Sequence, residues 1–169
     1  LGKHVMQKGS LVSPEKLRFD FSHNKPIEKN EMIKINKIVN KIVLDSSNVQ
    51  TRIMTPKEAV KLGAMALFGE KYGEEVRVVF MGKENNNFFS TELCGGTHVN
   101  NTKEIGSFSV VSQSSVASGV RRVEALRGEQ LTEFENKSNE NKKNKDKDLS
   151  IQISSLKNEL EALKVNPNY

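Results

Sequence analysis

The sequence has only one cysteine, Cys94, among its 169 residues. A single cysteine excludes an internal disulfide framework and is typical of a protein from a reducing compartment. No apolar run reaches the length of a membrane-spanning helix, and no signal-peptide pattern opens the chain. These absences predict a cytoplasmic protein with no membrane partner, with an organelle as the alternative if a targeting peptide was removed.

Apolar residues are also scarce, and positive charge exceeds negative charge. The hydrophobic fraction is 36% and the charged fraction 28%, which indicates a modest core plus a strongly polar segment. A net charge of +5 and a pI near 9.3 favour a polyanionic partner such as nucleic acid, although lysine-rich surfaces also occur simply for solubility. The chain begins at Leu1 without an initiator methionine, which predicts a piece of a longer protein.

Apolar residues alternate in two neighbouring segments, 5–12 and 17–21, which Pro14 separates. This alternation predicts two strands joined by a turn. Beyond Glu28, apolar residues recur at helical spacing and predict an amphipathic helix that ends near Asp45.

A short strand is predicted over residues 49–54. Directly after it, Thr55 and Glu58 have the spacing of a capping box, and Pro56 occupies the first helical position. A short helix through about Leu62 is therefore expected.

Residues 76–81 form the most apolar strand candidate and are expected at the centre of the sheet, with a loop at 85–87. Residues 108–111 and 120–126 complete the predicted sheet. Because strands and helices do not alternate as βαβ units, the fold class is α+β. We expect a twisted, mostly antiparallel sheet packed with helices, followed by a C-terminal helical, coiled-coil-like segment.

The character of the chain changes after Gly128. Residues 135–148 are almost all charged or amide-bearing, which fits either a solvated helix or a disordered tether. Apolar residues then recur at the a and d positions of a heptad: Leu149, Ile153, Leu156, Leu160 and Leu163. This pattern predicts self-association, with a helix that packs on its own domain as the alternative.

The segment Thr91–His98 (TELCGGTH) places Cys94 four residues before His98. Thiolate and imidazole suit zinc, and the intervening Gly95 and Gly96 allow a tight bend that aims both donors at one ion. A zinc site usually takes three or four protein ligands, so the pair is incomplete. The alternative is a free cysteine beside an unrelated histidine.

Four blocks taken together resemble the editing domain of alanyl-tRNA synthetases, and they occur in the order found in that family over residues 1–128. They are HVMQKGSLV at 4–12, LRFDFSH at 17–23, AMALFGEKY at 64–72, and TELCGGTH at 91–98 with GVRRVEA at 119–125. The resemblance implies an α+β domain that hydrolyses seryl or glycyl esters mistakenly attached to alanine tRNA.

The resemblance also implies the metal shell. In that family a zinc ion is held by an H-x-x-x-H pair on a helix, together with the residues that match Cys94 and His98. That helix is expected upstream of Leu1, so two of the four ligands are missing and the fragment is expected to be inactive alone. His4 and His23 do not match the missing pair.

Gln7 matches a position that lines the editing pocket of the family, and its amide suits orienting a water or a substrate hydroxyl. With Cys94 and His98 it completes the predicted catalytic set. A solvent-facing glutamine at a strand edge is the alternative. The hydroxyls of Thr91 and Thr97 are candidates for contacting a seryl side chain.

Three cations are predicted to contact RNA through its backbone rather than its bases: Lys8, Arg121 and Arg122. Adjacent residues on a strand face opposite ways, so one arginine is free for phosphate while Arg122 pairs with Glu124.

Together with the resemblance to alanyl-tRNA synthetases, this organisation implies a fragment of an alanine–tRNA ligase, with an editing domain at 1–128 and a charged linker and helical segment at 129–169. The intact ligase would use ATP and Mg²⁺ to charge alanine tRNA, and the partners would be that tRNA and the rest of the chain. The alternatives are a free-standing alanyl-tRNA deacylase and a non-catalytic basic RNA-binding or coiled-coil module. A threonyl enzyme is disfavoured by Gly95-Gly96-Thr97.

Overall fold

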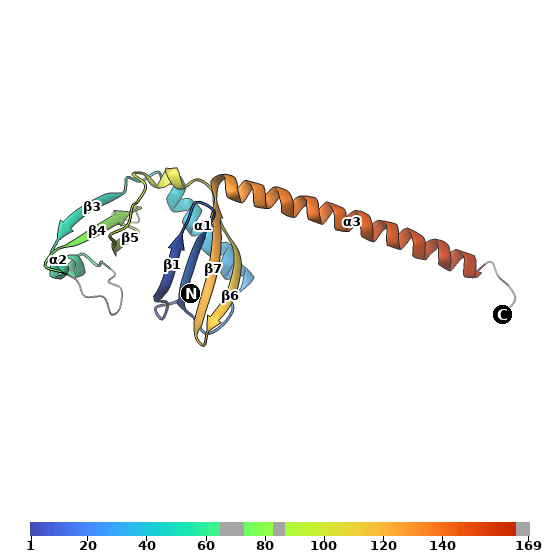
Figure 1. Ribbon diagram of the computed structural model, residues 1–169, viewed down its shortest axis with the longest axis horizontal. Helices are drawn as coiled ribbons and strands as arrows, with labels where there is room; N and C mark the ends of the chain where they lie inside the picture. Colours follow the sequence, from blue (N-terminus) through green and yellow to red (C-terminus); the bar gives the residue numbers. More distant parts are fainter. Residues whose placement is uncertain (65–72, 83–86, 165–169) are drawn as a thin grey trace. The chain divides into compact units, whose positions relative to one another are not determined.

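The computed structural model describes residues 1–64, 73–82 and 87–164. The chain divides into two compact units, Leu1–Leu131 and Thr132–Tyr169. The first unit contains two antiparallel sheets with helices, so the predicted α+β class is confirmed (Figure 1). The described strands form two sheets and not the single sheet expected from the sequence, because the strands at 50–54, 76–81 and 90–93 pair with one another and not with the other four.

The larger sheet has four strands in the order β1-β2-β7-β6. Their bounds are Gln7–Val12 for β1, Leu17–Ser22 for β2, Val120–Arg127 for β7 and Phe108–Ala117 for β6. Strand β6 extends beyond the predicted 108–111, because its exposed second half is held by backbone pairing to β7 and needs no apolar side chains.

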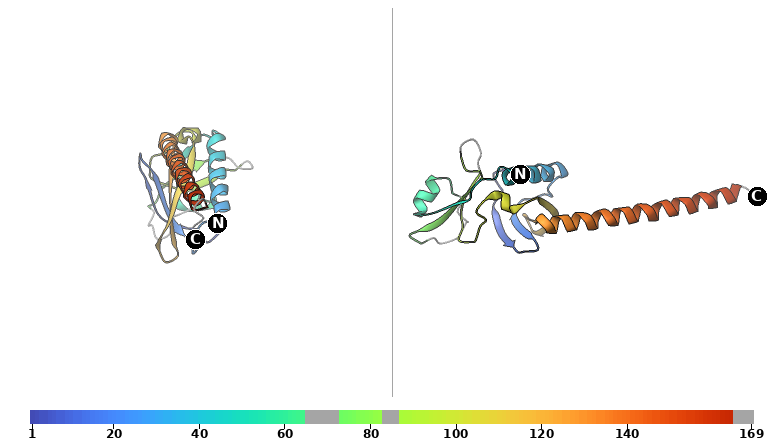
Figure 2. Two further views of the ribbon diagram at one scale, coloured as in Figure 1. Left: turned by 90° about the vertical axis from the view of Figure 1, so that its right-hand side faces the viewer. Right: turned by 90° about the horizontal axis from the view of Figure 1, so that it is seen from above.

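Helix α1 (Lys29–Leu44) covers one face of this sheet, as Figure 2 shows, and it ends at Asp45 as predicted. The apolar side chains of the helix and the sheet form one cluster: Phe21, Ile27 and Val123, with Val5, Phe19, Met32, Ile35 and Val110 packed against them. The other face of the sheet therefore carries the polar residues of the same strands.

Two asparagines of α1 bond to the edge strand β6. The Asn40 amide accepts the Phe108 N–H at 3.0 Å and donates to the Phe108 carbonyl at 2.7 Å, and Asn36 accepts the Val110 N–H at 3.0 Å. These bonds satisfy backbone groups that an edge strand would otherwise leave to solvent.

The smaller sheet has the order β3-β4-β5, with bounds Gln50–Met54, Val76–Met81 and Ser90–Leu93. Strand β4 is central, as predicted, and its Val78 and Val79 are completely buried. Helix α2 (Pro56–Lys61) follows β3 through the predicted capping box, in which Glu58 accepts the Thr55 N–H at 2.9 Å.

A 3-10 turn, η1 (Thr102–Ile105), leads from the smaller sheet to β6. Thr102 is completely buried; it accepts the Ser47 N–H and donates to the Ile42 carbonyl, each at 3.0 Å. Residues 65–72 of the AMALFGEKY block, and 85 and 86 of the predicted loop, lie outside the described residues.

Helix α3 (Gly128–Lys164) is continuous over 37 residues, so the charged stretch 135–148 is helical. The five apolar residues of its predicted heptads are all exposed: Leu149, Ile153, Leu156, Leu160 and Leu163. Over the described ranges, no helix combines the length and apolar character needed to cross a membrane.

Candidate functional site

The structure brings Cys94 and His98 together directly after β5. The Sγ atom of Cys94 lies 3.3 Å from Nε2 of His98, and Cys94 is half-buried while His98 is exposed. The Cys94 N–H donates to the Arg77 carbonyl at 3.1 Å, so the ladder between β4 and β5 continues into the turn. The chain then bends at Gly96, and the imidazole of His98 comes within reach of the sulfur.

Arg77 of β4 holds this turn in place, and the sequence analysis missed it. Its Nη1 donates to the carbonyls of Cys94 at 2.9 Å and of Gly96 at 2.5 Å. A guanidinium that donates to two carbonyls of one bend restrains the backbone there through charge-assisted hydrogen bonds. The only sequence signal is a lone arginine within the otherwise apolar VRVVFM strand.

Although the residue is exposed as a whole, partial desolvation of its ring lowers the pKa of His98, and the positive charge of Arg77 adds to the effect. Both causes disfavour the imidazolium and keep the ring neutral. The neutral ring is the form that binds a metal ion or accepts a proton.

The Cys94–His98 pair fits half of a zinc shell. Tetrahedral zinc with ordinary bond lengths would separate a thiolate sulfur from an imidazole nitrogen by roughly 3.6 Å, close to the 3.3 Å observed. Among the described residues, no group of three or more histidine, cysteine or acidic side chains could hold a metal ion. The two donors are therefore placed for one ion but need further ligands.

Glu92 is a second residue that the sequence analysis missed. Burial raises the pKa of its carboxyl, although the Ser90 hydroxyl donates to Oε1 at 2.9 Å and opposes the shift. The residue lies two positions before Cys94, opposite Val79 of β4. A raised carboxyl pKa is the direction that general acid–base catalysis uses near neutral pH. The only indication of Glu92 in the sequence is that an acidic residue stands two positions before the cysteine.

The two threonines near the site differ in their surroundings. Thr91 lies opposite Phe80 and shares the core face of the smaller sheet, whereas Thr97 is exposed in the turn between Cys94 and His98. Of the two hydroxyls, that of Thr97 is the one available to a ligand at the turn.

Gln7 begins β1 in the larger sheet, and its Nε2 donates to Ser10 Oγ at 3.2 Å. It lies opposite Phe21, which in turn lies opposite Arg121 of β7. Opposed residues share a face, so Gln7 and Arg121 are on the same side of the sheet. Lys8 is exposed at the β-bulge that follows Gln7.

Ser22 of β2 anchors the segment that leads to Gln7. Its hydroxyl donates to the His4 carbonyl at 2.6 Å and accepts the Met6 N–H at 2.8 Å, and its own N–H donates to the Met6 carbonyl at 2.9 Å. Three bonds from one residue fix where β1 begins.

The remaining histidines pair with each other. Nε2 of His4 lies 2.8 Å from Nδ1 of His23, and the rings stack at 5.1 Å. His4 lies in a turn before β1, which begins at Gln7, and His23 is buried directly after β2.

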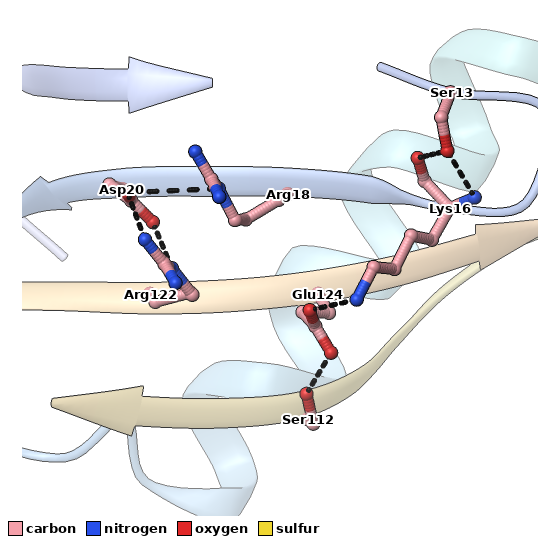
Figure 3. Close-up of polar contacts among 7 residues, drawn as sticks. All are labelled: Ser13, Lys16, Arg18, Asp20, Ser112, Arg122 and Glu124. Carbon is pink, nitrogen blue, oxygen red and sulfur yellow. Dashed lines mark hydrogen bonds and ion pairs between the residues drawn. The ribbon is translucent and has the colours of Figure 1, made fainter. Parts of the chain in front are cut away.

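The predicted pairing of Arg122 with Glu124 is wrong. Arg122 donates from Nε and Nη2 to the two oxygens of Asp20 at 2.7 and 2.8 Å, whereas Glu124 accepts from Lys16 at 2.5 Å (Figure 3). Asp20 lies directly opposite Arg122 on β2. Directly opposed residues are about 5 Å apart, which is closer than residues two apart along one strand.

Comparison with known proteins identifies the class of domain to which part of the chain is similar. Residues 76–124, which include β4, β5 and the Cys94–His98 turn, match the family described as "Threonyl and Alanyl tRNA synthetase second additional domain".

The chain belongs to the alanine–tRNA ligase family. It is 56% identical over 132 residues to "Alanine--tRNA ligase" of Parvibaculum lavamentivorans and 58% identical over 134 residues to that of Mesorhizobium japonicum. Each match covers 76% of this chain and 15% of the relative. The Nitrobacter winogradskyi protein is 54% identical over 143 residues, 80% of this chain and 16% of the relative. The chain thus spans about a sixth of the length of these relatives.

Proposed function

We propose that the domain hydrolyses esters of the wrong amino acid on alanine tRNA, with seryl and glycyl esters as substrates. The observation that most supports this proposal is the distance of 3.3 Å between Cys94 Sγ and His98 Nε2, in a chain that belongs to the alanine–tRNA ligase family. A thiol and a neutral imidazole at the end of a rigid strand are suited to half of a zinc shell.

A zinc ion at this position, completed by two further ligands, would polarise the ester carbonyl or lower the pKa of a bound water. Arg77 keeps the two donors in register by holding the carbonyls of Cys94 and Gly96. Among the described residues, the N–H groups of Gly95 and Gly96 have no acceptor, so they are free to stabilise negative charge on the ester oxygen.

Gln7 is proposed to orient water or the substrate hydroxyl, because an amide donates and accepts without carrying charge. The Thr97 hydroxyl is proposed to read the seryl side chain. A polar contact to the extra hydroxyl rejects alanine more strongly than an apolar pocket could exclude serine, which explains why a separate site is needed.

We infer the activity of the longer protein from the alanine–tRNA ligase family. The longer chain would bind ATP and Mg²⁺ and charge alanine tRNA in the cytoplasm, while this domain would remove the errors. Lys8 and Arg121 are proposed to contact the tRNA backbone near Gln7, because both are charged and lie close to it in the larger sheet.

The test is zinc content and seryl-tRNA hydrolysis, measured on this chain and on a version extended upstream through the expected histidine pair. Metal and hydrolysis are expected only in the extended form. Cys94→Ala there should lower the hydrolysis rate about a hundredfold or more, because loss of even an outer-shell partner of a metal ligand typically costs roughly 10–100-fold. Ser118→Ala, an exposed serine between β6 and β7, is the control and should leave the rate unchanged.

Three outcomes would contradict different parts of the proposal. Stoichiometric zinc in the present chain would mean that other residues complete the shell. Full hydrolysis by the Cys94→Ala variant would refute the proposed site, and no hydrolysis by either form would favour the non-catalytic binding module.

We also propose that α3 mediates self-association through its exposed apolar residues at heptad spacing, between Leu149 and Leu163. Ending the chain at residue 148 should then convert an oligomer into a monomer, measured as molar mass by light scattering. If the shortened and intact chains have the same stoichiometry, the apolar stripe has another role.

A further inference from the structure

The face of the larger sheet opposite α1 carries a charged cluster of five residues: Lys16, Arg18, Asp20, Arg122 and Glu124 (Figure 3). The apolar residues of the same strands face α1, so alternation places Arg18, Asp20, Arg122 and Glu124 on the opposite side. Nothing in the editing mechanism proposed above uses this cluster as a unit.

The charges of the cluster do not balance. Lys16 is matched by Glu124 at 2.5 Å, and Arg122 takes both oxygens of Asp20. Among the residues that the structure describes, Arg18 has only an ion pair with the same Asp20, with Nε 3.8 Å from Oδ2, which is too long for a hydrogen bond. One carboxylate thus serves two guanidinium groups, and Arg18 is the cation left without full compensation.

The hydrogen-bonding capacity of Arg18 is also unused. Its Nε is buried without a hydrogen-bond partner in the part of the chain that the structure describes. The side chain as a whole remains 32% accessible, against 12% for Asp20. An arginine has five N–H donors, so most of this fork is available to a ligand that approaches from solvent.

The surroundings of Arg18 favour an anion over a neutral ligand. The attraction of Asp20 restrains the guanidinium on the sheet, so less side-chain entropy is lost on binding. On the same face, β6 presents the short side chains Ser112 and Ser114 opposite Glu124 and Arg122, both exposed. Leu11 of β1 lies opposite Arg18, but the short serine side chains leave the β6 side of the cluster open to an extended polyanion.

We propose that Arg18 binds a phosphate of the tRNA backbone on this face of the sheet. The inference rests on the proposed function for the identity of the ligand, and it adds a contact on the side of the sheet opposite Gln7 and Arg121. A planar fork matches two phosphate oxygens, and such contacts fix the position of a nucleic acid without reading its sequence.

The test compares the affinity of this chain for alanine tRNA with that of the Arg18→Gln variant over a range of salt concentrations. Loss of one charged hydrogen-bonded contact should weaken binding about tenfold, and the slope of log K against log[salt] should become shallower by roughly 0.7–0.9. Lys34→Gln removes the same charge from an exposed position on α1 and should leave both quantities close to wild type.

Arg18→Gln leaves the bidentate Asp20–Arg122 pair intact, so the variant should fold, which thermal unfolding checks. Arg18→Lys provides a second variant. It keeps the charge and so the salt slope, but it should lose part of the affinity because an ammonium cannot form the bidentate contact.

An Arg18→Gln variant with wild-type affinity and salt slope would overturn the inference. So would an unchanged affinity for tRNA combined with lost association with the remainder of the ligase, since that would assign the face to a protein partner. Inorganic phosphate that competes with tRNA in the wild type but not in Arg18→Gln would support a phosphate site. Failure of the wild-type chain to bind tRNA at all would instead count against the proposed function.

Discussion

Asp20→Asn should lower the free energy of unfolding by about 3 kcal/mol, the range found when one partner of a buried ion pair is removed. The Asp20 side chain is only 12% exposed, and it lies between the guanidinium groups of Arg18 and Arg122. An amide in its place would leave two adjacent positive charges without a counter-charge. Chemical denaturation at pH 7 measures the effect.

The same residue predicts an acid dependence. Hydrogen bonds from Arg122 lower the pKa of Asp20 below its ordinary value of 3.8. Because the folded pKa lies below the unfolded one, the carboxylate contributes its stability above about pH 4 and loses it as the pH falls through the folded value. The difference between wild type and Asp20→Asn should therefore shrink below pH 3.8.

Asp45→Asn is the matched control for this prediction. Asp45 pairs with Lys41 at 2.9 Å in an exposed i,i+4 ion pair, so its loss should cost at most about 0.5 kcal/mol. Equal losses from the two substitutions would show that the Asp20 cluster contributes no more than an ordinary surface pair.

Phe80→Ala should destabilise the first unit by about 4 kcal/mol, as expected for removing a buried aromatic ring. Phe80 is 2% exposed on the central strand β4, and its ring lies 4.9 Å from that of Phe88 and 5.1 Å from the Arg52 guanidinium. The cavity would form in the sheet that carries Arg77 and the Cys94–His98 turn. Unfolding by denaturant, followed by circular dichroism, gives the free energy.

Phe89→Ala supplies the comparison, because Phe89 is 41% exposed and close to β5 in the sequence. It should cost less than about 1 kcal/mol, as surface substitutions away from packed sites usually do. A Phe80→Ala variant as stable as Phe89→Ala would mean that the smaller sheet is not packed around this ring.

The two predictions address the two sheets separately, and each sheet supports a different part of the proposed chemistry. The larger sheet carries Gln7, Arg121 and the Arg18 cluster, which are the proposed contacts to RNA and substrate. The smaller sheet carries the cysteine and histidine. Loss of zinc affinity without loss of tRNA affinity is thus the signature expected for damage confined to the smaller sheet.

The sequence by itself determined the features that depend on neighbouring residues. The alternation in LRFDFS gave strand β2, and Thr55, Pro56 and Glu58 gave the start of α2, because strand period and helix capping are set within a few residues. The contact between Cys94 and His98 is also local, because the two residues are only four positions apart and two glycines lie between them.

The tertiary structure decided which distant residues meet. Three features depend on the register between segments that are far apart in the chain. The strands divide into two sheets, Arg122 pairs with Asp20 and not with Glu124, and Asn36 and Asn40 bond to β6. Arg77 can bond to the Cys94 carbonyl only because β4 pairs with β5. Composition and periodicity specify which face a side chain occupies, but the backbone pairing between strands specifies what lies opposite it.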